Sequence, residues 1–165
     1  MSAVERRLME MGLELPESCA PRGAFLPFRR EGRLVYMAGQ ICEWNGDVPY
    51  VGPVLSEGQR APAGMACIDL EAGRKAAEIS ALNLLFHLKA AAGGDLDRVD
   101  GVIRLGGFVQ CLQGFDRSPA VINGASDLLI ALYGETGRHA RTAVGVSGLP
   151  ANASVEVDAI FSLAA

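Results

Sequence analysis

Two charged residues near the C-terminus, Arg141 and Glu156, are the strongest candidates for chemistry in this sequence. Arg141 follows His139 by two residues, directly before a run that predicts a strand, so the two side chains point the same way if the strand begins early. An arginine holds a carboxylate through two parallel hydrogen bonds and keeps its charge at every physiological pH. A partly buried glutamate at position 156 would serve as a general acid or base.

Each of these residues also has a plain structural interpretation. We expect the strands that carry Arg141 and Glu156 to be antiparallel partners, and Arg141 then forms a surface or interface ion pair with Glu156 or with Asp158. Glu156 then only neutralises the arginine. A single histidine before a strand is more often a hydrogen-bonded structural residue, which applies to His139. His87 lies in an apolar helical pattern and is expected to pack or to face solvent.

The elements that must position these residues follow from hydrophobic periodicity and from glycine and proline punctuation. Apolar, β-rich runs predict strands at residues 34–38, 99–109, 142–146 and 154–163, with a further short edge strand at 48–51. Helical spacing of apolar residues predicts helices at residues 3–11, 69–92 and 118–133. The expected N-caps of the two long helices are Asp69 and Ser118. Gly106 and Gly107 indicate a bulge or a close backbone approach within their strand.

This order favours an α+β fold in which two helices cover one face of a mixed sheet, because two long helices are available for five or six strands. We expect one domain over residues 23–165, preceded by an N-terminal extension over residues 1–22 that carries the short helix. Alternation places Glu156 and Asp158 on one face of the last strand and two valines on the other. An acidic sheet face needs a cleft, so we expect a dimer or trimer that lines one between subunits.

Composition and missing motifs narrow the function. The 165 residues carry 15 Lys+Arg and 19 Asp+Glu, a net charge of −4, which argues against binding to nucleic acid or to an anionic membrane. The first twenty residues hold several charges and no run resembles a membrane span, so we expect a cytoplasmic protein. The sequence has no phosphate-binding loop, dinucleotide fingerprint, zinc-protease, serine-hydrolase or calcium-binding motif.

Four cysteines bear on metals and redox state: Cys19, Cys42, Cys67 and Cys111. They are far apart in the sequence and have no neighbouring histidine to complete a zinc set. We therefore expect four reduced thiols, no metal site and no cofactor.

An ordered set of short motifs resembles the YjgF/RidA family of reactive-intermediate deaminases, also called the L-PSP endoribonuclease family. The resemblance covers roughly residues 23 to 163. The motifs are Ala-Gly-Gln at 38–40, Gly-Phe-Val at 107–109 before Phe115, Asn123 at the start of a helix, Ala-Arg-Thr-Ala-Val at 140–144, Leu-Pro at 149–150 and Val-Glu-Val at 155–157. The tracts at 123–127 and 137–141 further resemble a longer branch of that family.

The resemblance implies a chorismate-mutase-like α+β fold and a homotrimer with three clefts between subunits that bind small carboxylates. In the deaminase members the substrate is a 2-imino acid in equilibrium with its enamine, and hydrolysis gives a 2-oxo acid and ammonia. By this resemblance Arg141 grips the carboxylate and Glu156 orients water. The same comparison suggests the remaining pocket residues: Asn123, Phe25, Ala143 and His139.

Three departures from the family pattern bear on the ligand. Phe25 stands where the family has a tyrosine, Ala38 where it has a serine and Ala143 where it has a cysteine. A pocket that keeps the carboxylate clamp but loses these polar groups should prefer a larger, less polar ligand. The alternative function is a non-catalytic trimeric module that binds a small carboxylate or a partner protein, or that has a regulatory role. Ribonuclease activity is disfavoured because the chain has no basic excess.

Overall fold

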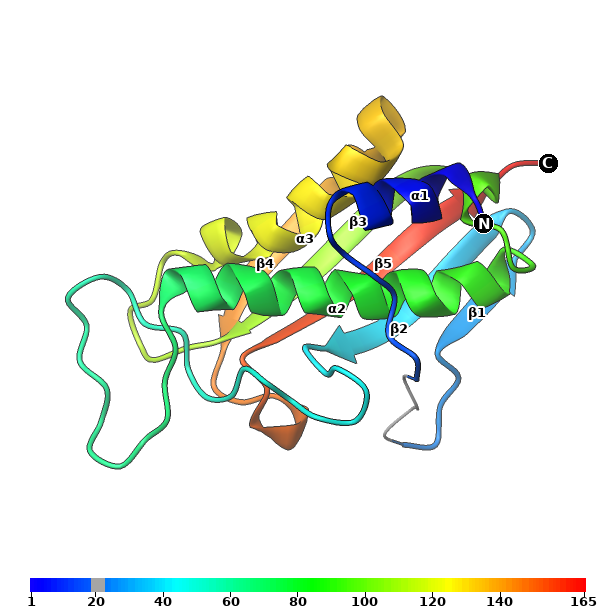
Figure 1. Ribbon diagram of the computed structural model, residues 1–165. Coiled ribbons are helices and arrows are strands. Elements are labelled where there is room, and N and C mark those ends of the chain that lie inside the picture. Colours follow the sequence, from blue (N-terminus) through cyan, green and yellow to red (C-terminus); the bar gives the residue numbers. More distant parts are fainter. Residues whose placement is uncertain (19–22) are drawn as a thin grey trace.

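A five-stranded mixed sheet forms the centre of the computed structural model, which describes residues 1–18 and 23–165 (Figure 1). The strands lie in the order β1-β2-β5-β3-β4. Their bounds are β1 Phe28–Glu31, β2 Leu34–Ile41, β3 Val99–Gln110, β4 Ala140–Val146 and β5 Val155–Leu163. The helices are α1 Ala3–Glu10, α2 Leu70–Ala91 and α3 Ser118–Tyr133, with short 3₁₀ turns η1 Leu96–Arg98, η2 Gly134–Gly137 and η3 Pro150–Asn152.

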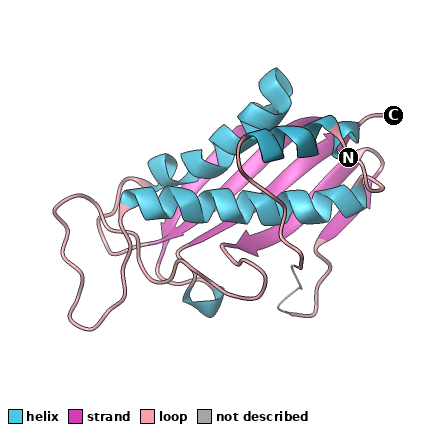
Figure 2. Cartoon of the chain, viewed as in Figure 1, coloured by secondary structure: helices cyan, strands magenta, loops and turns pink. Residues whose placement is uncertain are grey.

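Both long helices cover the same face of the sheet (Figures 1 and 2). α2 packs against β2 and β5, and α3 packs against β3 and β4. The opposite face, hereafter the open face, carries no helix among the described residues. The α+β class with two helices on one face of a mixed sheet is therefore confirmed. No helix in residues 1–18 and 23–165 is both long enough and apolar enough to cross a membrane.

The long helices begin and end close to where the sequence predicts. The Asp69 side chain accepts a hydrogen bond from the backbone N–H of Ala72 (2.8 Å), which is the expected N-cap of α2. The prediction for α3 was wrong by one residue, because the N-cap is Arg117 and Ser118 is already helical. Pro119 tolerates a place in this first turn because its missing N–H would have no helical partner there.

Two glycines allow the close packing of α3. A Cβ added to Gly124 would overlap the backbone carbonyl of Arg74 on α2, so the two helices approach more closely than any larger residue permits. A Cβ on Gly107 of β3 would meet the side chain of Ile122. The close backbone approach expected at Gly107 is therefore present, and it seats α3 directly on the sheet.

The strand pairing corrects one sequence expectation. β4 pairs with β3 in parallel, and β5 lies on the other side of β3 in antiparallel pairing. The strands that carry Arg141 and Glu156 are therefore not neighbours, and the expected antiparallel pairing between them is wrong. The physical reason is the α3 crossover, since a helix between two strands returns the chain in the same direction.

Smaller differences concern the sheet edges and the loops. β1 was not predicted and forms a hairpin with β2 through Gly32, whose φ of 58° suits a tight turn. The edge strand expected at 48–51 reduces to one isolated bridge between Val51 and Ala153. His87 is buried and lies edge-on to Phe86. Cys19 lies outside the described residues. The expected division between an N-terminal extension ending at residue 22 and a domain beginning at residue 23 stays a prediction.

Candidate functional site

The Arg141 guanidinium lies between β4 and α3, held by oxygen atoms of the helix. Its Nη1 donates to Asn123 Oδ1 (2.8 Å) and to Ser126 Oγ (3.0 Å), and its Nη2 donates to the carbonyl of Pro119 (3.2 Å). Asn123 and Ser126 are three residues apart on α3 and so share one helix face. We call Arg141, Asn123, Ser126 and His139 the arginine cluster.

The hydrogen bonds of His139 fix its tautomer. Nδ1 lies 2.7 Å from the carbonyl oxygen of Gly137, which only accepts, so Nδ1 carries a proton. In the neutral ring Nε2 is then an acceptor, and it lies 3.0 Å from Ser126 Oγ. The Ser126 hydroxyl therefore donates to His139 while its oxygen accepts from Arg141. The carbonyl of Gly137 therefore fixes the direction of both histidine hydrogen bonds, and those of Arg141 follow because a guanidinium only donates.

Electrostatics favour the neutral imidazole. Burial lowers the pKa of His139 below 6.5, and the charge of Arg141 lowers this pKa further, whereas the hydrogen bond to Gly137 opposes the shift. His139 is consequently uncharged at neutral pH. Within this chain it is linked to Arg141 through the Ser126 hydroxyl and forms no hydrogen bond with the guanidinium itself.

No carboxylate of the described chain forms an ion pair with Arg141. All three of its acceptors are neutral oxygens, and its Nε–H and one Nη2–H have no described acceptor. Within one chain Arg141 is not the ion-pair partner of Glu156 or Asp158, and Asp158 instead pairs with Arg104 (2.9 Å). A half-buried guanidinium with unused donors can bind a small carboxylate.

Glu156 lies on the open face in the middle of the sheet. Its strand alternates between buried valines and partly exposed polar residues, so its side chain leaves the helix-covered core. Burial raises the pKa of the Glu156 carboxyl, and the neighbouring charge of Asp158 adds to this rise. A Cβ on Gly39 would overlap the carboxylate of Glu156, so the absent side chain of Gly39 makes room for it. No hydrogen bond joins Glu156 to another described residue.

Strand register places Arg141 and Glu156 on opposite faces of the sheet. Arg141 is opposite Leu105, which is fully buried under the helices, so Arg141 lies on the helix-covered face. Glu156 is opposite Phe108, three residues further along β3 and thus on the other face. The two residues predicted to act together do not meet in one chain.

The remaining predicted residues divide between the two sides. Ala143 follows Arg141 by two residues on β4 and shares its face. Phe25 is 48% exposed in the loop before β1, at the sheet edge opposite β4. That loop is joined to the Gly39 region, because Ala38 N–H donates to the carbonyl of Pro27 (2.9 Å). One chain thus unites Arg141, Asn123, His139 and Ala143, and leaves Phe25 and Glu156 elsewhere.

Sequence reasoning did not single out Ser126 as a site residue. Its signal was its spacing, three residues after Asn123 on a predicted helix, which puts both side chains on the face toward β4. It is buried, and among the described residues it is the one that forms hydrogen bonds with both His139 and Arg141.

Comparison with known proteins agrees with this architecture. The family described as "YjgF/chorismate mutase-like, putative endoribonuclease" matches residues 5–162. Protein TCP17 of Trypanosoma cruzi is 37% identical over 161 residues, which are 97% of this chain and 94% of that protein. The structure of Atu1372 from Agrobacterium tumefaciens, a protein described as having unknown function, is 40% identical, with a TM-score of 0.84 over 98% of this chain and 92% of that one. RidA from Psychrobacter sp. PAMC 21119 shares the fold at 23% identity, with a TM-score of 0.54 over 90% and 94% of the two chains.

Proposed function

Because the chain belongs to the YjgF/RidA family, we propose that it hydrolyses reactive 2-imino acids, and the enamines in equilibrium with them, in a cleft between subunits. The observation that carries this proposal is Arg141. Its guanidinium is fixed by three neutral oxygens, and two of its N–H groups have no described acceptor. Such a group suits the carboxylate that every 2-imino acid carries.

The reaction needs little beyond positioning. Water adds to the carbon of the C=N bond, the resulting carbinolamine transfers a proton to nitrogen, and the C–N bond breaks to release ammonia and the 2-oxo acid. The imine is already electrophilic, so holding the substrate and one water molecule together supplies most of the required acceleration. Arg141 fixes the carboxylate end of the substrate in this proposal.

Glu156 is proposed as the group that accepts the proton of the attacking water and returns it to the departing nitrogen. Its raised pKa supports this role, because a carboxyl that titrates nearer to neutrality exchanges protons more readily than an ordinary glutamate. Gly39 beside it leaves space for the reacting atoms or for the carboxylate itself.

The opposite orientations of Arg141 and Glu156 support a site built from two chains. In this proposal the arginine cluster of one subunit faces Glu156 and the Phe25 loop of its neighbour. The open face also exposes large apolar side chains, with Tyr36 44% and Val144 41% exposed, and an assembly would cover them. The family resemblance implies a homotrimer, which we propose as this assembly.

A second candidate is a non-catalytic carboxylate-binding module. Phe25 and Ala143 favour it, because neither supplies a hydroxyl or a thiol to the proposed cleft. This candidate keeps the role of Arg141 and removes that of Glu156.

The two candidates separate in a coupled assay. An amino-acid oxidase generates small, aliphatic or aromatic 2-imino acids, and their loss and the release of ammonia are followed with and without the protein. A deaminase accelerates the loss, Arg141→Ala abolishes the acceleration, and Glu156→Gln reduces it about a hundredfold while carboxylate affinity changes only a few-fold. Arg138→Ala is the matched control, since Arg138 is exposed and pairs with Glu135.

Background rates with every imino acid would end the deaminase proposal. Calorimetry with pyruvate or 2-oxobutyrate then decides the second candidate. Binding that depends on Arg141 supports the module, and no binding by the wild type excludes it.

A further inference from the structure

A groove of about 500 Å³ lies beside α2, separate from the arginine cluster and from Glu156. Its walls combine the aromatic rings of Trp44 and Tyr50 with the aliphatic side chains of Ile79 and Leu82. Three carboxylates line it as well, from Glu14, Asp47 and Glu78, and no lysine or arginine of residues 1–18 and 23–165 does. A volume of this size falls within the range of small-molecule sites.

Local structure holds the aromatic wall in place. Trp44 and Asp47 close a tight turn through two backbone hydrogen bonds (2.7 and 3.1 Å), and the residues between them have the positive φ angles that such a turn requires. The Asn45 side chain accepts from the backbone N–H of Glu17 (2.7 Å), which ties the N-terminal segment to the turn. Tyr50 is anchored to the core because its carbonyl accepts from Ser154 N–H (3.1 Å). The groove is therefore largely preformed.

Within the described residues no cation is bonded to the carboxylates of the groove. Glu14, Asp47 and Glu78 have no hydrogen bond or ion pair with any other side chain of the described residues. The charges of Lys75 and Arg74 on α2 act on Glu78 from a distance. Neither cation bonds to it, because Lys75 bonds to Glu71 (3.3 Å) and Arg74 bonds to Asp127 (2.8 Å).

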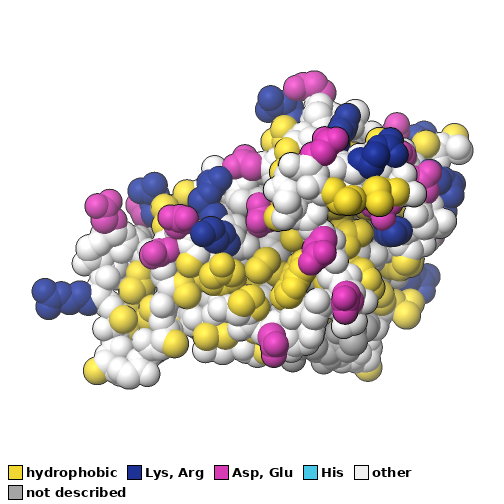
Figure 3. Space-filling view, viewed as in Figure 1, with side chains coloured by type: hydrophobic (Ala, Val, Ile, Leu, Met, Phe, Trp, Pro, Cys, Tyr) yellow, Lys and Arg dark blue, Asp and Glu magenta, His cyan; other side chains and the backbone are white. Residues whose placement is uncertain are grey.

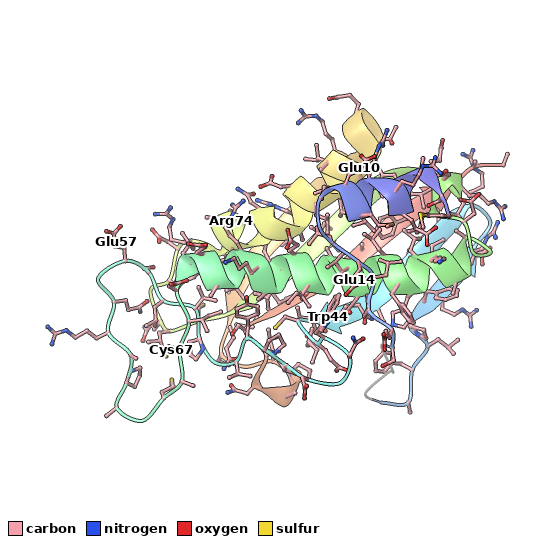
Figure 4. The ribbon with its side chains drawn as sticks, viewed as in Figure 1. Glu10, Glu14, Trp44, Glu57, Cys67 and Arg74 are labelled. Atoms are coloured by element: carbon pink, nitrogen blue, oxygen red, sulfur yellow. The ribbon has the colours of Figure 1, made fainter. Side chains whose placement is uncertain are left out.

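The surface views agree with this distribution. Figure 3 shows hydrophobic side chains across the middle of this face with acidic groups among and around them, and most basic groups lie toward the edges. In Figure 4 Glu14 and Trp44 lie close to each other beside α2, whereas Glu57 and Cys67 lie on the distant loop. The groove thus has the complementary charge for a cation and an apolar floor.

We propose that this groove binds an aliphatic polyamine, a flexible cation with two or more ammonium groups joined by methylene chains. Trp44 and Tyr50 offer aromatic faces, which attract ammonium groups, and the carboxylates attract them over a longer range. Ile79 and Leu82 contact the methylene chain. A metal ion would use the carboxylates but not the rings, and a neutral aliphatic ligand would use the rings but not the carboxylates. An organic cation uses both, and three carboxylates suit one that carries more than one ammonium group.

The test uses Trp44, which is the single tryptophan of the chain and therefore reports on the groove alone. Spermidine is titrated into the full-length protein while tryptophan fluorescence is recorded at constant ionic strength. We expect a saturable change with half-saturation below about 1 mM in dilute buffer, weakening as salt is added. Mg²⁺ at the same ionic strength should leave the signal nearly unchanged.

Two variants and one control decide the assignment. Glu14→Gln combined with Asp47→Asn should weaken spermidine binding at least about fivefold, because both charges face the groove. Glu78→Gln, a single change on a helix surface, gives the same answer if the double variant fails to fold. Glu57→Gln removes the same charge on the distant loop and should not change the affinity.

The proposal is overturned if spermidine gives no saturable change, if Mg²⁺ matches it at equal ionic strength, or if Glu78→Gln and Glu57→Gln bind spermidine equally. Imino-acid turnover plays no part in this readout, so its outcome is independent of the function proposed above.

Discussion

Arg141 and Glu156 point to opposite faces of one sheet, with β3 between their strands. The separation follows from register, because Arg141 is aligned with Leu105 and Glu156 with Phe108, an odd number of residues apart on the same strand. A ligand that touches both groups must therefore lie between two copies of the chain.

Mixing two inactive variants should restore activity if the site is shared. Arg141→Ala and Glu156→Gln each remove one of the two proposed site residues. A mixed oligomer nevertheless contains interfaces in which an intact arginine faces an intact glutamate. After random subunit exchange in equal amounts, about one quarter of the sites should be active. Imino-acid hydrolysis by each variant alone and by the exchanged mixture measures this fraction. A mixture as inactive as its components would contradict a site shared by Arg141 and Glu156.

Gly39→Ala should disturb catalysis without unfolding the protein. The added Cβ would overlap the Glu156 carboxylate, a flexible side-chain end that can move away at little cost in stability. Turnover should fall at least about tenfold because the carboxylate leaves its place, while the melting temperature shifts only slightly. Gly148→Ala is the matched control, since a Cβ there meets nothing within 4 Å. Normal turnover in Gly39→Ala would show that the position of Glu156 is not critical.

Ser126→Ala should loosen Arg141 and release His139 together. The wild-type ring is expected to carry its proton on Nδ1, and nitrogen NMR can read this tautomer because the chain has only two histidines. Removal of the hydroxyl leaves Nε2 without a donor, at a cost of about 1–3 kcal/mol in unfolding free energy. Carboxylate affinity should weaken about three- to tenfold. A wild-type ring protonated on Nε2 would contradict the assigned direction of the hydrogen bonds.

Stability should fall on the acid side of neutrality in a way that depends on His139. The folded pKa lies below the ordinary value of 6.5, so above that value the residue is neutral in both states and its contribution is complete. As the pH drops below 6.5, His139 becomes protonated in the unfolded chain before it does so in the folded one, and the unfolding free energy decreases. Urea unfolding between pH 7.5 and 5.5 should show a smaller decrease in His139→Asn.

His87 provides the internal comparison for this experiment. Burial lowers its pKa as well, so it contributes a decrease of the same sign that persists in His139→Asn. Equal pH dependence in the variant and the wild type would mean that His139 is not held neutral by the fold.

Local signals in the sequence were sufficient to predict where the helices lie. α2 was foreseen because Asp69 caps it, apolar residues recur at helical spacing and Gly93 follows its end. The pairing of β4 with β3 was not foreseen, since a short strand carries no mark of its neighbours. The alternation around Glu156 indicated which residues share a face, but not that Arg141 occupies the other face, which depends on register between distant strands.

The same distinction applies to the arginine cluster. His139 and Arg141 could be grouped from their spacing, and Asn123 from the family resemblance. The spacing of Ser126 puts it on the helix face of Asn123, but a serine inside a helix usually points to solvent or bonds to its own backbone. Only the packing of α3 on β4 reveals that its hydroxyl joins the other residues.

Gly124 gives α2 an influence over a site to which it contributes no described atom. The contact between Gly124 and the backbone of Arg74 sets the distance between α2 and α3, and the oxygens that hold Arg141 move with α3. Substitutions along the buried side of α2 can therefore shift the position of the Arg141 guanidinium without touching it. In a library of variants, changes on α2 and changes at Asn123 or Ser126 should be epistatic, so the ligand preference of the protein would evolve through the spacing of two helices as well as through the residues of the cleft.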